Sequence, residues 1–106
     1  MTLINLTPHE VILCGTKIPA SGQQARVSMT RAQTGTIDID GTTVPIYRTI
    51  LGTVTGLPPV NEGIGYIVSA MVRSAAPERR DIYSPADLLR DSSGAVIGCN
   101  SLDANQ

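Results

Sequence analysis

"TGTIDIDGTTVPIYRTI", residues 34–50, carries the clearest structural signal in the chain. Isoleucines alternate with polar residues up to Asp40-Gly41, a pair that suits a tight hairpin turn because both turn positions need a positive φ. Apolar and polar residues alternate again after the turn, so a return strand is expected there. Pro45 has no N–H to donate to a ladder, which places this strand at a sheet edge or in a bulge.

Shorter signals lie on the N-terminal side of this hairpin. Alternating or apolar runs predict strands at residues 4–7, 11–14 and 25–29. Pro and Gly in the segment "IPASG" (18–22) predict a loop between the second and third of these strands.

The C-terminal half predicts both strands and helix. Residues 51–59 predict one more short strand, ended by two prolines, and the apolar run 66–68 predicts a buried strand. Ser69 suits the N-cap of a short helix over 70–76, which Pro77 would stop. The remaining predicted elements are a short helical piece around 86–89, a turn at 91–94, a closing strand at 95–99 and a frayed tail at 103–106.

Length and composition predict one small β-rich domain over residues 1–102. A chain of 106 residues has room for one domain. Short strands at roughly 8–12-residue spacing with one or two short helices favour an α+β fold, a compact small sandwich or a barrel-like sheet. The chain has no Phe and no Trp, so its core is thin. Such a domain gains from pairing its apolar faces, and we expect a homo-oligomer.

Charge and hydropathy exclude some partners. The net charge of −1 argues against binding to a nucleic acid polymer, which usually requires a basic surplus. No apolar run is long enough to cross a membrane, and the first residues lack the pattern of a secretory signal, so we expect no membrane partner. Seven of the eight basic residues are arginine, which suits phosphate and carboxylate.

The usual catalytic patterns are missing. The chain has one histidine and no phosphate-binding glycine loop or nucleophile elbow, and its carboxylates are scattered. We therefore expect no metal, no cofactor and no catalytic residue. Cys14 and Cys99 are predicted to be buried thiols in strands, because no second cysteine or histidine lies near either one.

The remaining polar groups suit an anionic ligand that carries a ring. Arginine forks bind phosphate, tyrosine rings stack on bases, and donors at a strand end can hold a polar ligand. The candidate ligand-binding residues are Asn5, Thr7, His9, Arg26, Arg48, Tyr66, Arg73, Arg80 and Tyr83.

Each candidate also has a plainer interpretation. His9 would close the turn after the first strand through a backbone hydrogen bond, and Tyr66 would belong to the core. Arg26 would be solvated on a polar strand face. Arg80 would form a surface ion pair with Asp81, an interaction that contributes little to stability.

Five segments together resemble a group of small proteins encoded by tailed phages and prophages. The segments are INLTPHEVILCG, IPASGQQARV, DGTTVPIYRTILGTVTGLPP, GYIVSAMVRSAAPERRDIYSP and RDSSGAVIGC. The likeness extends over nearly the whole chain, and the INLTPH opening and the SGxxAR and YIVS segments are its most distinctive parts. The resemblance implies a protein of the cytoplasm of an infected bacterial host.

A looser analogy concerns function. In size, arginine preference and expected oligomerisation the chain is similar to phage anti-defence sponges such as Sequestin and Lockin, which bind cyclic ADP-ribose isomers or related conjugates. Other sponges trap cyclic oligonucleotides. The analogy implies that the protein sequesters a host nucleotide messenger without cleaving it. The arginines would neutralise the diphosphate, Asn5, Thr7 and His9 would bond ribose or base, and Tyr66 or Tyr83 would stack on adenine.

Two alternatives remain open. One is a metal-independent phosphodiesterase that uses His9 as acid or base. The other is a phage structural protein or an accessory protein that binds a host protein, which would use exposed apolar strand surface for assembly.

Overall fold

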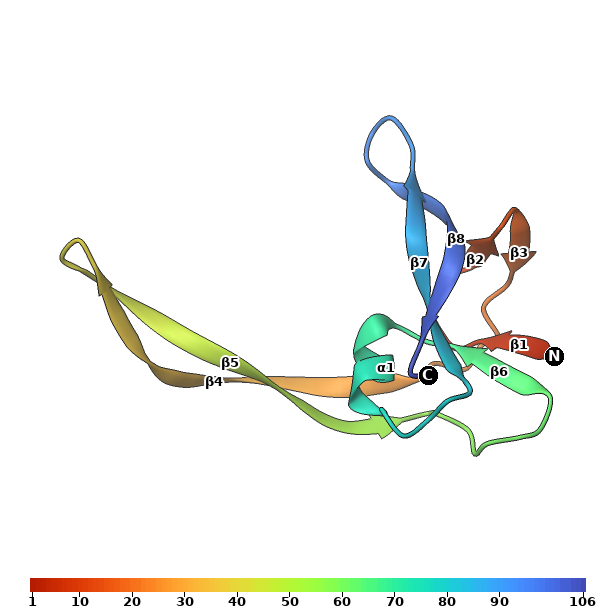
Figure 1. Ribbon diagram of the computed structural model, residues 1–106, viewed down its shortest axis with the longest axis horizontal. Helices are drawn as coiled ribbons and strands as arrows, with labels where there is room; N and C mark the ends of the chain where they lie inside the picture. Colours follow the sequence, from red (N-terminus) through yellow and green to blue (C-terminus); the bar gives the residue numbers. More distant parts are fainter.

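The computed structural model describes residues 1–106 and consists almost entirely of strands (Figure 1). The elements, in chain order, are β1 (Thr2–Asn5), β2 (Val11–Leu13), β3 (Thr16–Ile18), β4 (Arg26–Ile39), β5 (Thr42–Thr55), β6 (Ile64–Ile67), α1 (Ala70–Ala75), β7 (Ile82–Arg90) and β8 (Val96–Ala104). The helix is the one predicted after Ser69, whose Oγ accepts a hydrogen bond from the backbone N–H of Val72.

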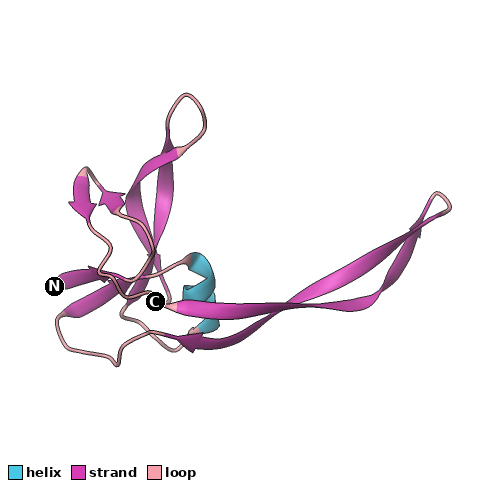
Figure 2. Ribbon diagram, turned by 180° about the vertical axis from the view of Figure 1, so that it is seen from behind, coloured by secondary structure: helices cyan, strands magenta, loops and turns pink.

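Six strands form a barrel-like sheet in the order β1-β6-β7-β8-β2-β3. The two ends of this order approach each other, because Asn5 at the end of β1 forms a parallel bridge with Ala20, just after β3. The predicted fold class is confirmed: the protein is a β-rich α+β domain with a nearly closed sheet and a single short helix (Figure 2).

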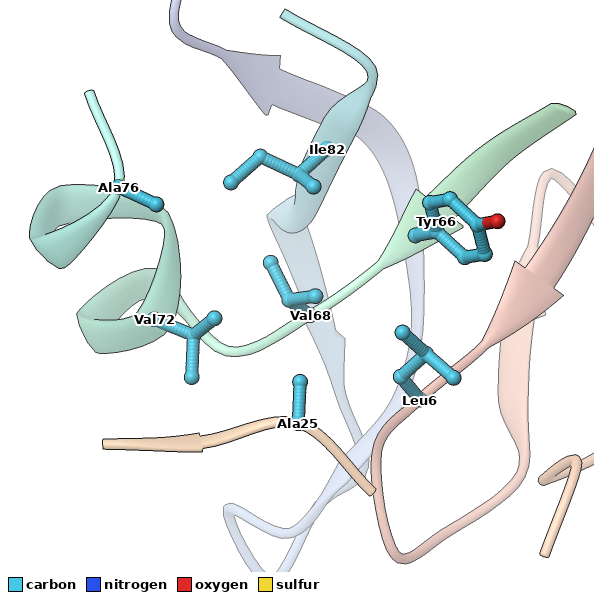
Figure 3. Close-up of a cluster of buried hydrophobic side chains, with 7 residues drawn as sticks. All are labelled: Leu6, Ala25, Tyr66, Val68, Val72, Ala76 and Ile82. Atoms are coloured by element: carbon cyan, nitrogen blue, oxygen red, sulfur yellow. The ribbon is translucent and has the colours of Figure 1, made fainter. Parts of the chain in front are cut away.

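The core is small and lies where α1 covers the sheet (Figure 3). Seven buried side chains form it: Leu6, Ala25, Tyr66, Val68, Val72, Ala76 and Ile82. Aliphatic side chains at the base of β4 and β5, Val27 and Val54, pack against this cluster. The base of the β4–β5 hairpin is therefore attached to the core, and the rest of the hairpin extends away from it.

Asn5 connects three segments of the nearly closed sheet. Its side-chain Nδ2 donates to the carbonyl of His9 at 2.8 Å and to that of Ile18 at 3.1 Å. Its Oδ1 accepts from the backbone N–H of Thr7 at 2.9 Å, and the Thr7 hydroxyl lies 2.6 Å away. Only 1% of the residue is exposed, so these bonds replace water for every polar atom of the buried amide.

The β4–β5 hairpin, residues 26–55, projects from the body as an arm (Figure 1). The predicted turn is confirmed, with φ of 49° at Asp40 and 83° at Gly41. Each strand pairs only with the other, which fits the expected edge position of Pro45. The radius of gyration is 17.2 Å, whereas a globular domain of 100 residues has about 13 Å.

Three local predictions are wrong. No separate strand starts at residue 51, because residues 51–55 are the end of β5. Residues 86–89 are not helical: they belong to β7 and pair with β8, so tertiary pairing overrides the helical propensity of this segment. Cys14 is exposed in the turn after β2, and only Cys99 is a buried strand thiol.

The C-terminal residues 103–106, expected to fray, are instead bonded to the body. Strand β8 runs through Ala104. The side chain of Asn105 then donates to three backbone carbonyls in and after α1, at 3.0–3.1 Å, those of Arg73, Ala76 and Arg79. The carbonyls of Arg73 and Ala76 also accept from the backbone N–H groups of Ala76 and Arg79, and Asn105 adds a side-chain cap to this C-terminal end of α1.

Replacing Asn5 by Ala tests its role in closing the sheet. We expect the free energy of unfolding to fall by about 3 kcal/mol, because two carbonyls and one N–H lose their partners at once. The control is Asn100→Ala, an exposed strand position, which we expect to change stability by less than about 0.5 kcal/mol. Urea unfolding followed by circular dichroism measures both, and equal losses in the two variants would contradict the assignment.

Candidate functional site

Two of the predicted ligand-binding residues are part of the interior. Tyr66 is 4% exposed and belongs to the core cluster, which agrees with the alternative that it is a core residue (Figure 3). Asn5 uses all of its side-chain hydrogen bonds within the protein. Thr7 bonds to Asn5, and exposed His9 offers its carbonyl to the same amide. This loop is therefore ordered by its own contacts.

Three further candidates lie beside α1. Arg73 donates from Nε to the Ser84 hydroxyl at 2.8 Å and from Nη1 to Asn105 at 3.3 Å, so its side chain holds the helix on the sheet. Arg80 is exposed in the turn before β7. Tyr83 is half-buried on β7.

The predicted ion pair of Asp81 forms with a different arginine. Arg79, not Arg80, donates to both carboxylate oxygens of Asp81 at 2.8 Å. This guanidinium holds the pKa of Asp81 below its ordinary value, and the carboxylate raises that of Arg79. Arg79 also donates to the carbonyl of Pro58. Its positive charge is already matched by the carboxylate of Asp81.

The surface hollows do not gather the predicted residues. One of about 350 Å³ lies at the base of the arm between Val54, Leu57 and Arg79. An apolar one of about 340 Å³ lies between Ile12 and Ile97. The third, of about 150 Å³, is the only one that includes a predicted residue, Thr7. Within one chain the predicted residues therefore do not form a single pocket.

The arm carries three of the arginines that have no carboxylate partner. Arg26, Arg31 and Arg48 lie on it, and the single ion pair of the structure is elsewhere. The only acidic residues of the arm, Asp38 and Asp40, lie at its tip. The guanidinium carbon of Arg31 lies 4.2 Å from the centre of the Tyr47 ring, a cation–π contact.

A bulge at Thr34 decides which residues share a face of the arm. Near the tip of the arm, Ile37 is opposite Val44. Closer to the body, Gln33 is opposite Tyr47, so four residues of β4 correspond to three of β5 and one extra residue lies on β4. A shift of one residue moves every later side chain to the other face. The bulge thereby puts Arg31 on the face of Tyr47, and an uninterrupted pairing would put it on the opposite face.

A second register shift, between Val27 and Met29, returns the base of the arm to the register found near the tip. Val27 is opposite Val54, and both face the core. The strands approach closely here, since a Cβ at Gly52 would clash with the hydroxyl of Ser28. The base of the arm can therefore pack on the core although the middle of the arm is shifted.

The pairing divides the arm into two faces. We call the first the apolar face, which near the tip consists of Gly35, Ile37, Ile39, Thr42, Val44 and Ile46, followed inward by Arg48 and Ile50. We call the second the arginine face, which in the middle of the arm consists of Met29, Arg31, Gln33, Tyr47, Thr49 and Leu51. Arg26 lies at the base, where its guanidinium is bonded to the side chain of Gln24.

The sequence does not reveal Arg31 and Tyr47 as a pair. If residues are paired one by one from the Asp40-Gly41 turn toward the body, Arg31 and Tyr47 fall on opposite faces. The bulge that brings them together leaves no clear signal in the sequence. Of the predicted residues, Arg26 and Arg48 are on the arm, but Arg48 belongs to the apolar face.

Comparisons of the chain with protein-family models, with curated proteins and with solved structures found no match. No helix of the structure has the length and hydropathy needed to span a membrane. No three His, Cys, Asp or Glu side chains lie close enough together to hold a metal ion.

Deletion of Thr34 tests the effect of the bulge. Without the extra residue, Gln33 directly precedes Gly35 and stays opposite Tyr47, so Arg31 stays opposite Thr49 on the face of Tyr47. We expect the side-chain protons of Arg31 to keep their upfield ring-current shift in NMR spectra of the deletion variant and to lose it in Tyr47→Leu. Thr36→Ala, which keeps the chain length, is the control. An Arg31 shift that differs between the deletion variant and the wild type would contradict the register argument.

Proposed function

We propose that this protein binds an anionic nucleotide messenger and holds it without chemistry, as a phage anti-defence sponge would. The observation that carries the proposal is the contact of Arg31 with Tyr47 in the middle of the arm, where no carboxylate pairs with Arg31. A cation and an aromatic ring held side by side suit a ligand that has both a phosphate and a base.

The physical basis is charge that is available to a ligand. Arg31 lies on a ring and has no acidic partner, so its outward N–H groups can donate to phosphate oxygens. The planar fork of arginine matches a phosphate in two places at once. Met29 and Leu51 on the same face are exposed and offer apolar surface to a base. Arg26 at the base of the arm would supply a second positive charge.

The other predicted residues enter this proposal differently. Thr7, His9, Arg80 and Tyr83 lie on the body, away from the arginine face, and would contribute only if a second subunit brings them to it. Asn5, Tyr66 and Arg73 keep their structural contacts and would support the site indirectly. Arg48 lies on the apolar face and is not needed for the ligand.

A second candidate function rests on the apolar face of the arm. Ile37 and Ile39 are 48% and 51% exposed at the end of a ribbon that projects from the body. Exposed apolar surface of this kind marks protein–protein contacts. A structural or accessory role in a phage assembly would use this face and would need no small ligand.

A ligand-release experiment tests the proposed function. The purified protein is incubated with cyclic ADP-ribose isomers, ADP-ribose conjugates and cyclic dinucleotides, filtered and heat-denatured, and the released compound is identified by mass spectrometry. We expect one intact compound in near-stoichiometric amount. Arg31→Gln should weaken its binding by at least about tenfold, because a charged hydrogen bond is lost.

The matched control is Arg90→Gln, which removes the same charge from the other hairpin, where Arg90 donates to the carbonyl of Gly94. Equal affinity of Arg31→Gln and the wild type would remove the arginine face from the site. A chemically altered compound would indicate the phosphodiesterase with His9 as acid or base. If nothing binds, the accessory role is favoured.

A further inference from the structure

The chain exposes more surface than a monomer of its size should. A folded protein of 11.2 kDa is expected to expose about 5,700 Å². This chain exposes 7009 Å², an excess of about 1,300 Å² over that expectation. Obligate dimers bury at least about 1,000 Å² on each partner, so the excess is what one such interface would cover.

The apolar face of the arm has nothing in its own chain to cover it. Near the tip its residues come from a ribbon of two strands, with no third strand and no second layer. Isolated ribbons of this kind are marginally stable in water. The face therefore needs a partner that is itself apolar and extended.

We propose that the partner is a second copy of this chain, with the tip halves of the two arms packed antiparallel through their apolar faces. The inference does not depend on the proposed ligand. A two-fold contact of this kind is closed, because the same patch faces itself and no free end remains for further copies.

Charge complementarity supports a second copy in this orientation. Arg48 is the one charged residue of the apolar face, and no carboxylate of its own chain pairs with it. Asp40 lies in the turn at the tip. An antiparallel arrangement places Asp40 of each arm beside Arg48 of the other, so both charges are matched at the two ends of the contact.

The spacing along the arm fixes where the two-fold axis lies. Arg48 is seven residues from Gly41, or about 23 Å along the strand. The midpoint of this span falls at the rung of Ile37 and Val44. These residues and their neighbours Ile39 and Ile46 would then face the same four residues of the partner and bury them.

Cysteine cross-linking locates the axis. In a background of Cys14→Ser, which removes the exposed native thiol, Val44→Cys places a thiol near the axis and Thr43→Cys places one on the opposite face of the same strand. We expect a short bismaleimide to link Val44→Cys chains in pairs and to link Thr43→Cys chains far less. Equal linking of the two variants, or none in either, would overturn the arrangement.

Sedimentation tests the dimer and its ion pair. We expect the wild type to sediment as a dimer and the variant with both Ile37→Ser and Ile46→Ser to be a monomer whose circular dichroism stays native-like. Arg48→Gln and Asp40→Asn should each raise the dissociation constant about three- to tenfold, and together by less than the product of the two. Asn keeps the positive φ of the turn.

Other results would contradict the proposal. A wild-type monomer at high concentration would exclude the second copy as the partner of this face. A dimer that persists in the double serine variant would place the interface elsewhere, for example at the apolar hollow near Ile97. Strictly multiplicative effects of Arg48→Gln and Asp40→Asn would show that the two residues do not touch.

Discussion

Closure of the barrel-like sheet depends on one buried amide. Only 12 of the 106 residues are buried, so apolar packing alone gives this body little stability. Asn5 joins the end of β1 to the loop at His9 and to the end of β3, and each of its side-chain polar atoms has a partner. The two ends of the sheet therefore meet through hydrogen bonds, and the loop that carries the only histidine is ordered as a consequence.

A body closed in this way can support an arm that contributes little to its core. Strands β4 and β5 have 14 residues each, and only their base packs on the core cluster. The bulge at Thr34 then sorts the arm into an apolar face and an arginine face. One inserted residue thus separates two kinds of surface, of which the first suits another protein chain and the second suits an anionic ligand.

The sequence predicts those features that short-range chemistry decides. The Asp40-Gly41 turn and the Ser69 cap follow from the backbone preferences of these residues, and both are found. The length of the arm was not predicted, because bulges interrupt the alternation at Thr34 and near Gly52 and make one long strand look like two short ones. The segment around Leu88 forms a strand because β8 pairs with it, and such long-range pairing has no local signal.

The candidate site was less predictable than the turn and the cap, because it depends on burial and on strand register. Polar residues near the first strand looked available for a ligand, yet a buried position turns Asn5 into a structural residue, and no sequence pattern reveals that burial. The pairing of Arg31 with Tyr47 depends on a single-residue shift. Arg26 is exposed, as predicted, and its guanidinium is bonded to the side chain of Gln24.

The central claim is that the arm is stabilised by association and the body by its own contacts. Hydrogen exchange measured by mass spectrometry at high and at low protein concentration tests this claim most directly. The account predicts that amides of residues 26–55 beyond the base of the arm lose protection on dilution, while those of β6 and β7 stay protected. Protection of the arm that is independent of concentration and equal to that of the body would contradict it.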